Sequence, residues 1–195
     1  NGKFGIVVAA YDTELFGHWW FEGVAWIKGV LRHLAARDTV ELTTASDFIE
    51  EHPPEDVMAL NEGSWGQAGN HFTWRNADTE WMWPIIHGLE LRMEALVARH
   101  PDASGDMREI LGQAARELLL AESSDWPFLV TTGQAREYAT QRFTEHVSRF
   151  QQMSDIADSG EVDEPGRELC RSLYEQDNVF PDIDYRVFAN REQTL

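Results

Sequence analysis

The fold of this chain is indicated first by the stretch Phe4-Gly5-Ile6-Val7-Val8-Ala9-Ala10-Tyr11-Asp12-Thr13-Glu14. Its first six residues form an uninterrupted apolar run, the kind of strand that is buried on both faces of a parallel sheet. An acid therefore follows the carboxyl end of a predicted strand, where α/β proteins place their chemistry. We interpret Asp12 as a candidate catalytic residue, with the alternative that it caps a short helix.

The predicted strand has few partners in the sequence. Only the short stretch from Thr39 to Thr43 has a similar character. Two strands are too few to bury a sheet that is covered by helices on both sides. We therefore expect this chain to be the tail of a larger protein.

The sequence after Asp12 is predominantly helical. Apolar residues at three- and four-residue steps predict a helix over residues 20–36, with Trp26 on its packed side. A short helix is expected from a cap at Ser46 or Asp47 to Glu51, where Pro53-Pro54 ends it. Residues 61–76 contain three glycines, two tryptophans and no apolar period, which predicts an ordered loop.

Four longer helices are predicted beyond that loop. Apolar stripes mark the first over residues 85–97, begun or kinked by Pro84, and the second over residues 107–119. The third includes residues 138–153, with Thr131-Thr132 as its N-cap. Short links between these helices indicate antiparallel packing in a small bundle.

The last predicted helix begins at Glu164-Pro165 and carries Cys170 on its apolar stripe. The acidic stretch from Ser154 to Glu164 is expected to be a mobile turn. Residues 179–188 are expected to form an extended tail that packs back through Phe180, Tyr185 and Phe188.

Composition narrows the classes of partner. The chain has 34 acidic and 16 basic residues among 195, a formal charge of −18, which argues against a nucleic acid or an anionic membrane surface. A neutral ligand fits better. The single cysteine excludes an intramolecular disulfide and suits the reducing cytoplasm, and no apolar run is long enough to span a bilayer.

Metal and cofactor motifs are not found. The seven histidines show no His-Glu-x-x-His spacing, and one cysteine cannot build a zinc cluster. The sequence has neither a glycine-rich phosphate loop nor a Gly-x-Ser-x-Gly elbow. We predict no metal and no cofactor, and we interpret Cys170 as a core residue rather than a nucleophile.

Tryptophans are distributed unevenly along the chain. Seven of the eight lie in the first 83 residues, beside acids and histidines. Indole faces stack on the C–H faces of sugars while polar side chains bind hydroxyls, so the pattern predicts a carbohydrate groove. For any single tryptophan, packing remains an equal alternative, and for Trp26 it is preferred.

Longer motifs carry a family resemblance. These are Tyr11-Asp12-Thr13-Glu14-Leu15-Phe16-Gly17-His18-Trp19-Trp20-Phe21-Glu22-Gly23, Glu62-Gly63-Ser64-Trp65-Gly66 and Trp74-Arg75-Asn76. They resemble the last two signature regions of glycoside hydrolase family fifty-seven, and within it the 1,4-α-glucan branching enzymes. The segments 124–128 and 180–185 resemble the same group, so the likeness covers nearly the whole chain.

The resemblance implies a mainly α fold with two parts. Residues 1–44 would be the C-terminal end of a catalytic (β/α)7 barrel, including its last β-strand and helix. Residues 45–195 would be a helical-bundle domain that contributes aromatic residues to the active site. The rest of the barrel would lie in an upstream portion of the same enzyme.

Residue roles are also implied by the resemblance. Asp12 would be the general acid/base of a retaining mechanism, supported by Glu14, whereas the nucleophilic Glu belongs to an earlier signature region that this sequence does not contain. The substrate-binding residues would be His18, Trp19, Trp20, Trp65, Trp74 and Asp125.

The expected function is the C-terminal part of a retaining enzyme that cleaves α-1,4 links and transfers the chain to a 6-hydroxyl. Its partner would be an α-glucan such as amylose or a glycogen-like polymer, and the chain alone would be inactive without the nucleophile. An α-amylase or 4-α-glucanotransferase of the same family, or a non-catalytic glucan-binding helical module, remain alternatives.

Overall fold

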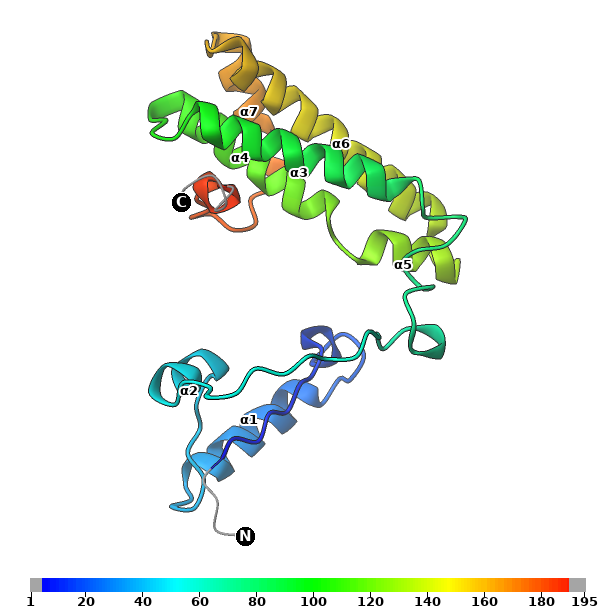
Figure 1. Cartoon of the computed structure of the whole chain (residues 1–195), viewed down its shortest axis with the longest axis vertical. Coiled ribbons are helices and arrows are strands. Elements are labelled where there is room, and N and C mark those ends of the chain that lie inside the picture. Colours follow the sequence, from blue (N-terminus) through cyan, green and yellow to red (C-terminus); the bar gives the residue numbers. More distant parts are fainter. Residues whose placement is uncertain (1–4, 190–195) are drawn as a thin grey trace. The chain divides into compact units, whose positions relative to one another are not determined.

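The computed structural model describes residues 5–189 of the chain. The chain divides into two compact units, Asn1–Asn61 and Glu62–Leu195 (Figure 1). The second unit is built mainly from helices, whereas more than half of residues 5–61 lie outside any helix.

The first unit contains a 3-10 turn (Thr13–Leu15) and the helices α1 (Gly23–Ala35) and α2 (Ala45–Glu51). Both predicted helices are therefore confirmed. The cap of α2 was predicted wrongly, because Thr44 holds that position and its Oγ1 accepts the backbone N–H of Asp47 at 3.1 Å. A threonine hydroxyl satisfies one of the free N–H groups of the first helical turn.

The strand predictions are wrong for the described residues. Residues 5–10 and 39–43 form no strand, and Phe4 lies outside the described residues. Val7 and Val8 are 95% and 69% exposed. A strand is stabilised by hydrogen bonds and side-chain pairs with neighbouring strands. Residues 5–189 contain no such neighbour, so the apolar run stays extended and unpaired.

Aromatic rings hold the first unit together. Trp26 of α1 lies 5.1 Å from the ring of Trp20 and 6.5 Å from that of Phe16, so it packs against both rings, although its side chain is 40% exposed. Gly23 begins α1 under these rings. A Cβ at Gly23 would lie 3.2 Å from both the Phe16 and the Trp20 side chains, so a small residue allows the close approach.

The second unit contains α3 (Met82–Arg99), α4 (Gly105–Ala121), α5 (Asp125–Thr132), α6 (Arg136–Ser159) and α7 (Glu164–Gln176). α4 lies at the centre, against α3, α6 and α7 (Figure 1). The predicted stripes do supply the core, to which four helices contribute Leu89, Met93, Leu96, Ile110, Leu111, Leu118, Phe150, Met153, Cys170 and Leu173.

Two features between the helices differ from the predictions. Thr131-Thr132 does not cap α6 but ends α5, a helix that the sequence analysis missed, and Gly133 follows in the left-handed conformation with φ 71°. Glycine adopts this conformation without steric cost. The predicted mobile turn from Ser154 is also wrong up to Ser159, because α6 continues there and buries Ser154 and Ala157.

The C-terminal segment packs back onto the bundle. Tyr185 is buried, and its Oη accepts the backbone N–H of Ala103 at 3.0 Å and donates to the carbonyl of His100. Phe188 packs against the same core. The packing prediction is confirmed for these two residues and wrong for Phe180, which is 56% exposed. The predicted extended conformation is wrong for the last four residues of the segment, which form a 3-10 helix (Tyr185–Phe188) whose first turn is capped by the carboxylate of Asp184.

Cys170 lies in the core, as predicted. Burial, with Glu109 nearby, raises the pKa of its thiol to about 11. The side chain is therefore protonated and inert near neutral pH. Among the helices within residues 5–189, none combines the length and apolarity that crossing a bilayer requires.

The substitution Tyr185→Phe tests how the C-terminal segment is held. It leaves the backbone groups of Ala103 and His100 without their phenol partner, and we expect the free energy of unfolding to fall by about 1–3 kcal/mol. Urea denaturation measures this. The control Tyr138→Phe, at a 57% exposed tyrosine, should change stability by less than about 0.5 kcal/mol. Equal stability of the two variants would contradict the anchoring role.

Candidate functional site

A loop before α3 places two of the predicted tryptophans in contact. The rings of Trp65 and Trp74 lie 4.9 Å apart, edge to face, and Trp65 also lies 5.8 Å from the ring of Phe128 on α5. Trp65 is 78% exposed, whereas Trp74 is half-buried. The two indoles therefore offer an accessible aromatic surface at one end of the helical unit.

Side-chain hydrogen bonds fix the conformation of this loop. Ser64 Oγ accepts the N–H of Gly66 at 3.0 Å, and Thr73 Oγ1 accepts the N–H of Gln67 at 3.1 Å. Asn76 donates to Thr131 of α5 at 2.8 Å. These bonds confirm that residues 61–76 form an ordered loop, which contains only a short 3-10 turn (Gln67–Gly69).

Gly66 permits the contact between the loop and Trp74. A Cβ at this position would lie 2.6 Å from Cζ3 of Trp74 and 2.8 Å from Thr73 Oγ1. No side chain fits at those distances without displacing the indole. Gly66, the last residue of the Glu62-Gly63-Ser64-Trp65-Gly66 motif, thus has a packing role next to the tryptophans.

The carbonyl oxygen of Trp74 connects the loop to α3. It accepts hydrogen bonds from Thr79 Oγ1 at 2.9 Å and from Trp83 Nε1 at 3.2 Å. Thr79 is completely buried. One acceptor therefore holds both the loop and the indole of Trp83, in the first turn of α3, in fixed positions.

A cavity of about 840 Å³ lies beside Trp74. Residues from the loop, from the first turns of α3 and from the α4–α5 junction line it: His71, Trp74, Arg75, Glu80, Trp83, Pro84, Ile86, His87, Glu122, Ser123, Ser124 and Pro127. Flat apolar faces thus alternate with hydrogen-bonding groups. This composition is typical of small-molecule sites.

Glu122 is the cavity residue whose ionisation departs most clearly from the ordinary. Burial, together with a hydrogen bond and charge repulsion from Glu90, raises its pKa to about 7. The two carboxyls share a site at the end of α4 and on α3. A carboxyl in this state is partly protonated at neutral pH and can both donate and accept hydrogen bonds.

The remaining predicted site residue of this unit, Asp125, lies at the start of α5 and is exposed. It follows Ser123 and Ser124 of the cavity lining. Ser123 Oγ lies at 3.5 Å from its carboxylate. Trp65, Trp74 and Asp125 therefore belong to one neighbourhood of the second unit.

The other predicted site residues belong to the first unit. Asp12 precedes the 3-10 turn, is exposed, and makes no side-chain capping hydrogen bond, so the capping alternative is not supported. Glu14 is exposed in the same turn. His18 and Trp19 stack edge to face at 5.0 Å, and Trp20 is 37% exposed.

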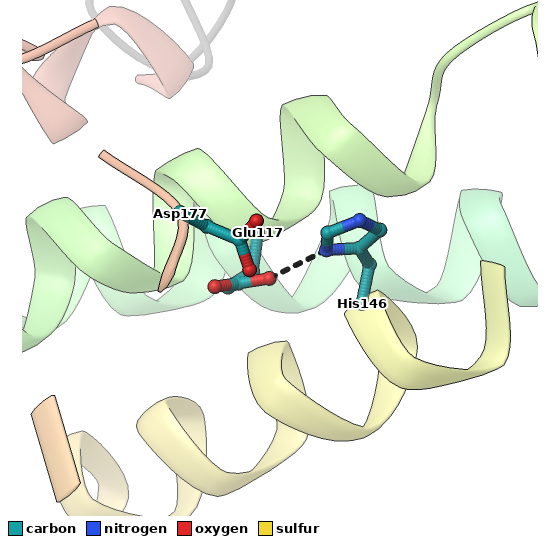
Figure 2. Close-up of side chains that lie close together, drawn as sticks. All are labelled: Glu117, His146 and Asp177. Carbon is teal, nitrogen blue, oxygen red and sulfur yellow. Dashed lines mark hydrogen bonds and ion pairs between the residues drawn. The ribbon is translucent and has the colours of Figure 1, made fainter. Parts of the chain in front are cut away.

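A second cluster of ionisable residues lies inside the bundle. Figure 2 shows Glu117 of α4, His146 of α6 and Asp177 after α7, whose oxygen and nitrogen atoms lie within 4.8 Å of one another. His146 Nδ1 and Glu117 Oε2 are 2.7 Å apart, and both side chains are fully buried. This spacing resembles that of a metal centre, and the hydrogen-bond and ion-pair partners of the three side chains decide between a metal site and a structural network.

The partners indicate a structural network rather than a metal centre. Arg142, which can only donate, lies 3.0 Å from His146 Nε2, so Nδ1 carries the hydrogen and donates to Glu117. Gln113 donates to the other oxygen of Glu117 at 2.8 Å. Arg149 pairs with Asp177. The positive charge that an ion would supply is already present.

Comparison with known families decides where the chain belongs. A family model described as 1,4-α-glucan branching enzyme, C-terminal, matches residues 85–188, which is more than half of the chain. The chain belongs to this family.

Relatives of this branching enzyme family match over nearly the whole chain. A 1,4-α-glucan branching enzyme of Thermococcus kodakarensis is 46% identical over 181 residues, 92% of this chain and 27% of the relative. Its crystal structure, in complex with glucose and additives, has a TM-score of 0.70 at 44% identity, over 97% of this chain and 34% of that one.

Two further crystal structures are similar. The GH57-type branching enzyme of Pyrococcus horikoshii has a TM-score of 0.70 at 44% identity, over 97% of this chain and 36% of that one. An α-amylase of Thermotoga maritima has a TM-score of 0.59 at 35% identity, over 94% of this chain and 33% of that one. The chain thus spans between 27% and 36% of the length of these relatives.

Of the residues that line the cavity, only Trp74 was predicted from the sequence as a site residue; Trp83, His87 and Glu122 are among those that were not. A signal was available for the two on α3. Trp83 and His87 are four residues apart and lie away from the buried stripe of Ile86 and Leu89. Glu122 carried no signal, because its environment arises from tertiary packing against Glu90.

The substitution Gly66→Ala tests the contact with Trp74. The added methyl group must displace the indole, and we expect a loss of about 1–3 kcal/mol in the free energy of unfolding and an altered near-ultraviolet circular dichroism. Gly88→Ala is the matched control, because nothing lies within 4 Å of its Cβ position on α3. That variant should be about 0.5–1 kcal/mol more stable. An unchanged spectrum and stability for Gly66→Ala would refute the close contact.

The stability of the chain should depend on pH through Glu122. Because the folded pKa of about 7 lies above the ordinary value of 4.5, the folded state binds the proton more tightly. Its stabilising contribution is complete below pH 4.5 and is lost as the pH rises through 7. Relative to Glu122→Gln, the native chain should lose about 1–2 kcal/mol over this range, a value reduced for partial solvent exposure. A difference between the two proteins that is constant with pH would contradict the shift.

Proposed function

We propose that this chain is the C-terminal part of a retaining 1,4-α-glucan branching enzyme. The enzyme would cleave α-1,4 links and transfer the released chain to the 6-hydroxyl of another glucan in the cytoplasm. The observation that carries the proposal is the aromatic surface of Trp65 and Trp74 beside a cavity with mixed polar lining, in a member of this family.

The two parts of the chain would have different tasks. Residues 1–44 would complete the catalytic barrel, whose upstream portion would cover the apolar side chains that the first unit exposes, such as Val7 and Phe21. Residues 45–195 would supply the aromatic groups. In this arrangement the apolar run from Ile6 would become a strand because the barrel provides its missing neighbours.

The mechanism needs two carboxyl groups about 5–5.5 Å apart. A glutamate of the upstream portion would attack the anomeric carbon, while Asp12 protonates the leaving oxygen. Asp12 would then take the proton from the 6-hydroxyl as that oxygen attacks the glucosyl-enzyme. Glu14, in the 3-10 turn that follows Asp12, would be its supporting residue.

Substrate binding would use aromatic faces of both units. Trp65 and Trp74 would hold the acceptor glucan and exclude water, which favours transfer over hydrolysis. His18, Trp19, Trp20 and Asp125 would bind other sugar units. The net charge of −18 fits a neutral polymer and disfavours a polyanion.

Two alternatives have specific support. The similarity to the Thermotoga maritima α-amylase favours hydrolysis on the same scaffold. The cavity lies wholly within the second unit, which favours a non-catalytic glucan-binding module. Linkage analysis of the product from amylose separates the three functions, since only branching creates α-1,6 links and a binding module creates no product.

The substitution Asp12→Asn tests the catalytic assignment. In an enzyme that joins this chain to its upstream barrel portion, we expect branching activity to fall by about 10²–10⁴-fold, since a general acid/base contributes that factor. Asp38→Asn, at another exposed aspartate of the first unit, is the control and should leave activity unchanged. Activity of Asp12→Asn within tenfold of the native enzyme would reject the assignment. The 195-residue chain alone should be inactive in the same assay.

A further inference from the structure

The cavity beside Trp74 has a second wall that none of the implied substrate-binding residues occupies. It consists of Trp83 and His87 on α3 and Glu122 after α4. We infer that Trp83, His87 and Glu122 form an additional sugar-binding subsite, which holds one glucosyl unit of an α-glucan next to Trp74. This inference rests on the proposed function, from which the class of ligand is taken.

The position of Trp83 is fixed before any ligand binds. Its Nε1–H donates to the carbonyl of Trp74 at 3.2 Å, so the polar edge of the indole is already satisfied. The ring is half-buried and lines the cavity together with Pro84. An oriented indole that lines a cavity is suited to stacking on the C–H face of a sugar ring, at little entropic cost.

Two polar residues of α3 lie on the same side of the helix as Trp83. His87 follows Trp83 by four residues, and Glu90 follows by seven, where it meets Glu122. The rings of Trp83 and His87 have their centres 6.2 Å apart. The imidazole is exposed and lines the cavity. A stacking face and a hydrogen-bonding ring are therefore adjacent.

Glu122 adds a group that suits hydroxyls. Burial and the neighbouring Glu90 keep it partly protonated near neutral pH, so it can donate to one hydroxyl oxygen and accept from another. A sugar hydroxyl has the same dual character. The partial burial of Glu122 also strengthens such bonds relative to bonds made in bulk water.

The balance of charges in the lining favours a neutral ligand. Arg75 and Glu80 bring charges of opposite sign to the lining, and Glu122 is partly protonated near neutral pH, so the cavity does not present a field of one sign to a ligand. Donors and acceptors of both kinds are available to a polyhydroxylated ring. Because Trp74 belongs to the same lining, a glucan bound on Trp65 and Trp74 can extend into this wall without leaving the second unit.

Titration of the chain with maltotriose tests the inference. Nuclear magnetic resonance follows the indole N–H and imidazole C–H signals into the millimolar range of sugar, where single-site binding of this kind is measurable. We expect Trp83→Ala and His87→Ala each to raise the Kd for maltotriose about three- to tenfold, because each removes part of the binding surface. Tyr138→Ala and His100→Ala, which alter side chains outside the cavity of the same unit, should not change the Kd.

The outcomes separate this inference from the proposed function. If Trp74→Ala weakens binding while Trp83→Ala and His87→Ala do not, the second wall is not a subsite and the proposed function is unaffected. The absence of any maltotriose effect on the cavity signals also overturns the inference. If Trp83→Ala fails to fold, His87→Ala decides, because its side chain is exposed. Weakened binding together with an active Asp12→Asn enzyme would retain the subsite and reject the catalytic proposal.

Discussion

The helical unit depends on the burial of α4. Ten of its seventeen residues are buried, including the charged Arg116 and Glu117. Burying charge is costly unless each group is paired, and here Gln113, His146 and the carbonyls of Val179 and Phe180 provide the partners. These partners lie on α4 itself, on α6 and on the C-terminal segment. The hydrogen bonds that the buried Arg116 and Glu117 require therefore also hold α6 and the C-terminal segment in position.

The candidate site is a consequence of this arrangement. The end of α4 delivers Glu122 next to Glu90 of α3, and the start of α5 follows directly with Pro127. The loop before α3 is then fastened through the carbonyl of Trp74, which accepts from both Thr79 and Trp83. The cavity is therefore shaped by helices whose positions are already determined by the core, which is the preorganisation that weak sugar binding needs.

The sequence predicted the parts that follow from local periodicity. The apolar stripe over residues 85–97 is one example. Trp65 and Trp74, which lie in a loop without periodicity, were identified instead from the motifs that carry the family resemblance. The strand predicted after Phe4 was wrong for residues 5–10, because a strand needs neighbouring strands that residues 5–189 do not contain. The raised pKa of Glu122 and the burial of His146 could not be predicted for a similar reason, since both depend on residues that are distant in sequence.

The proposed function and the subsite both require that the cavity beside Trp74 binds an α-glucan. A crystal structure of the chain soaked with maltotriose tests it most directly. We expect a glucosyl ring against the faces of Trp74 and Trp83, with hydroxyls within hydrogen-bonding distance of His87 and Glu122. A sugar bound elsewhere, with only water between these side chains, would show that the cavity is not a glucan site.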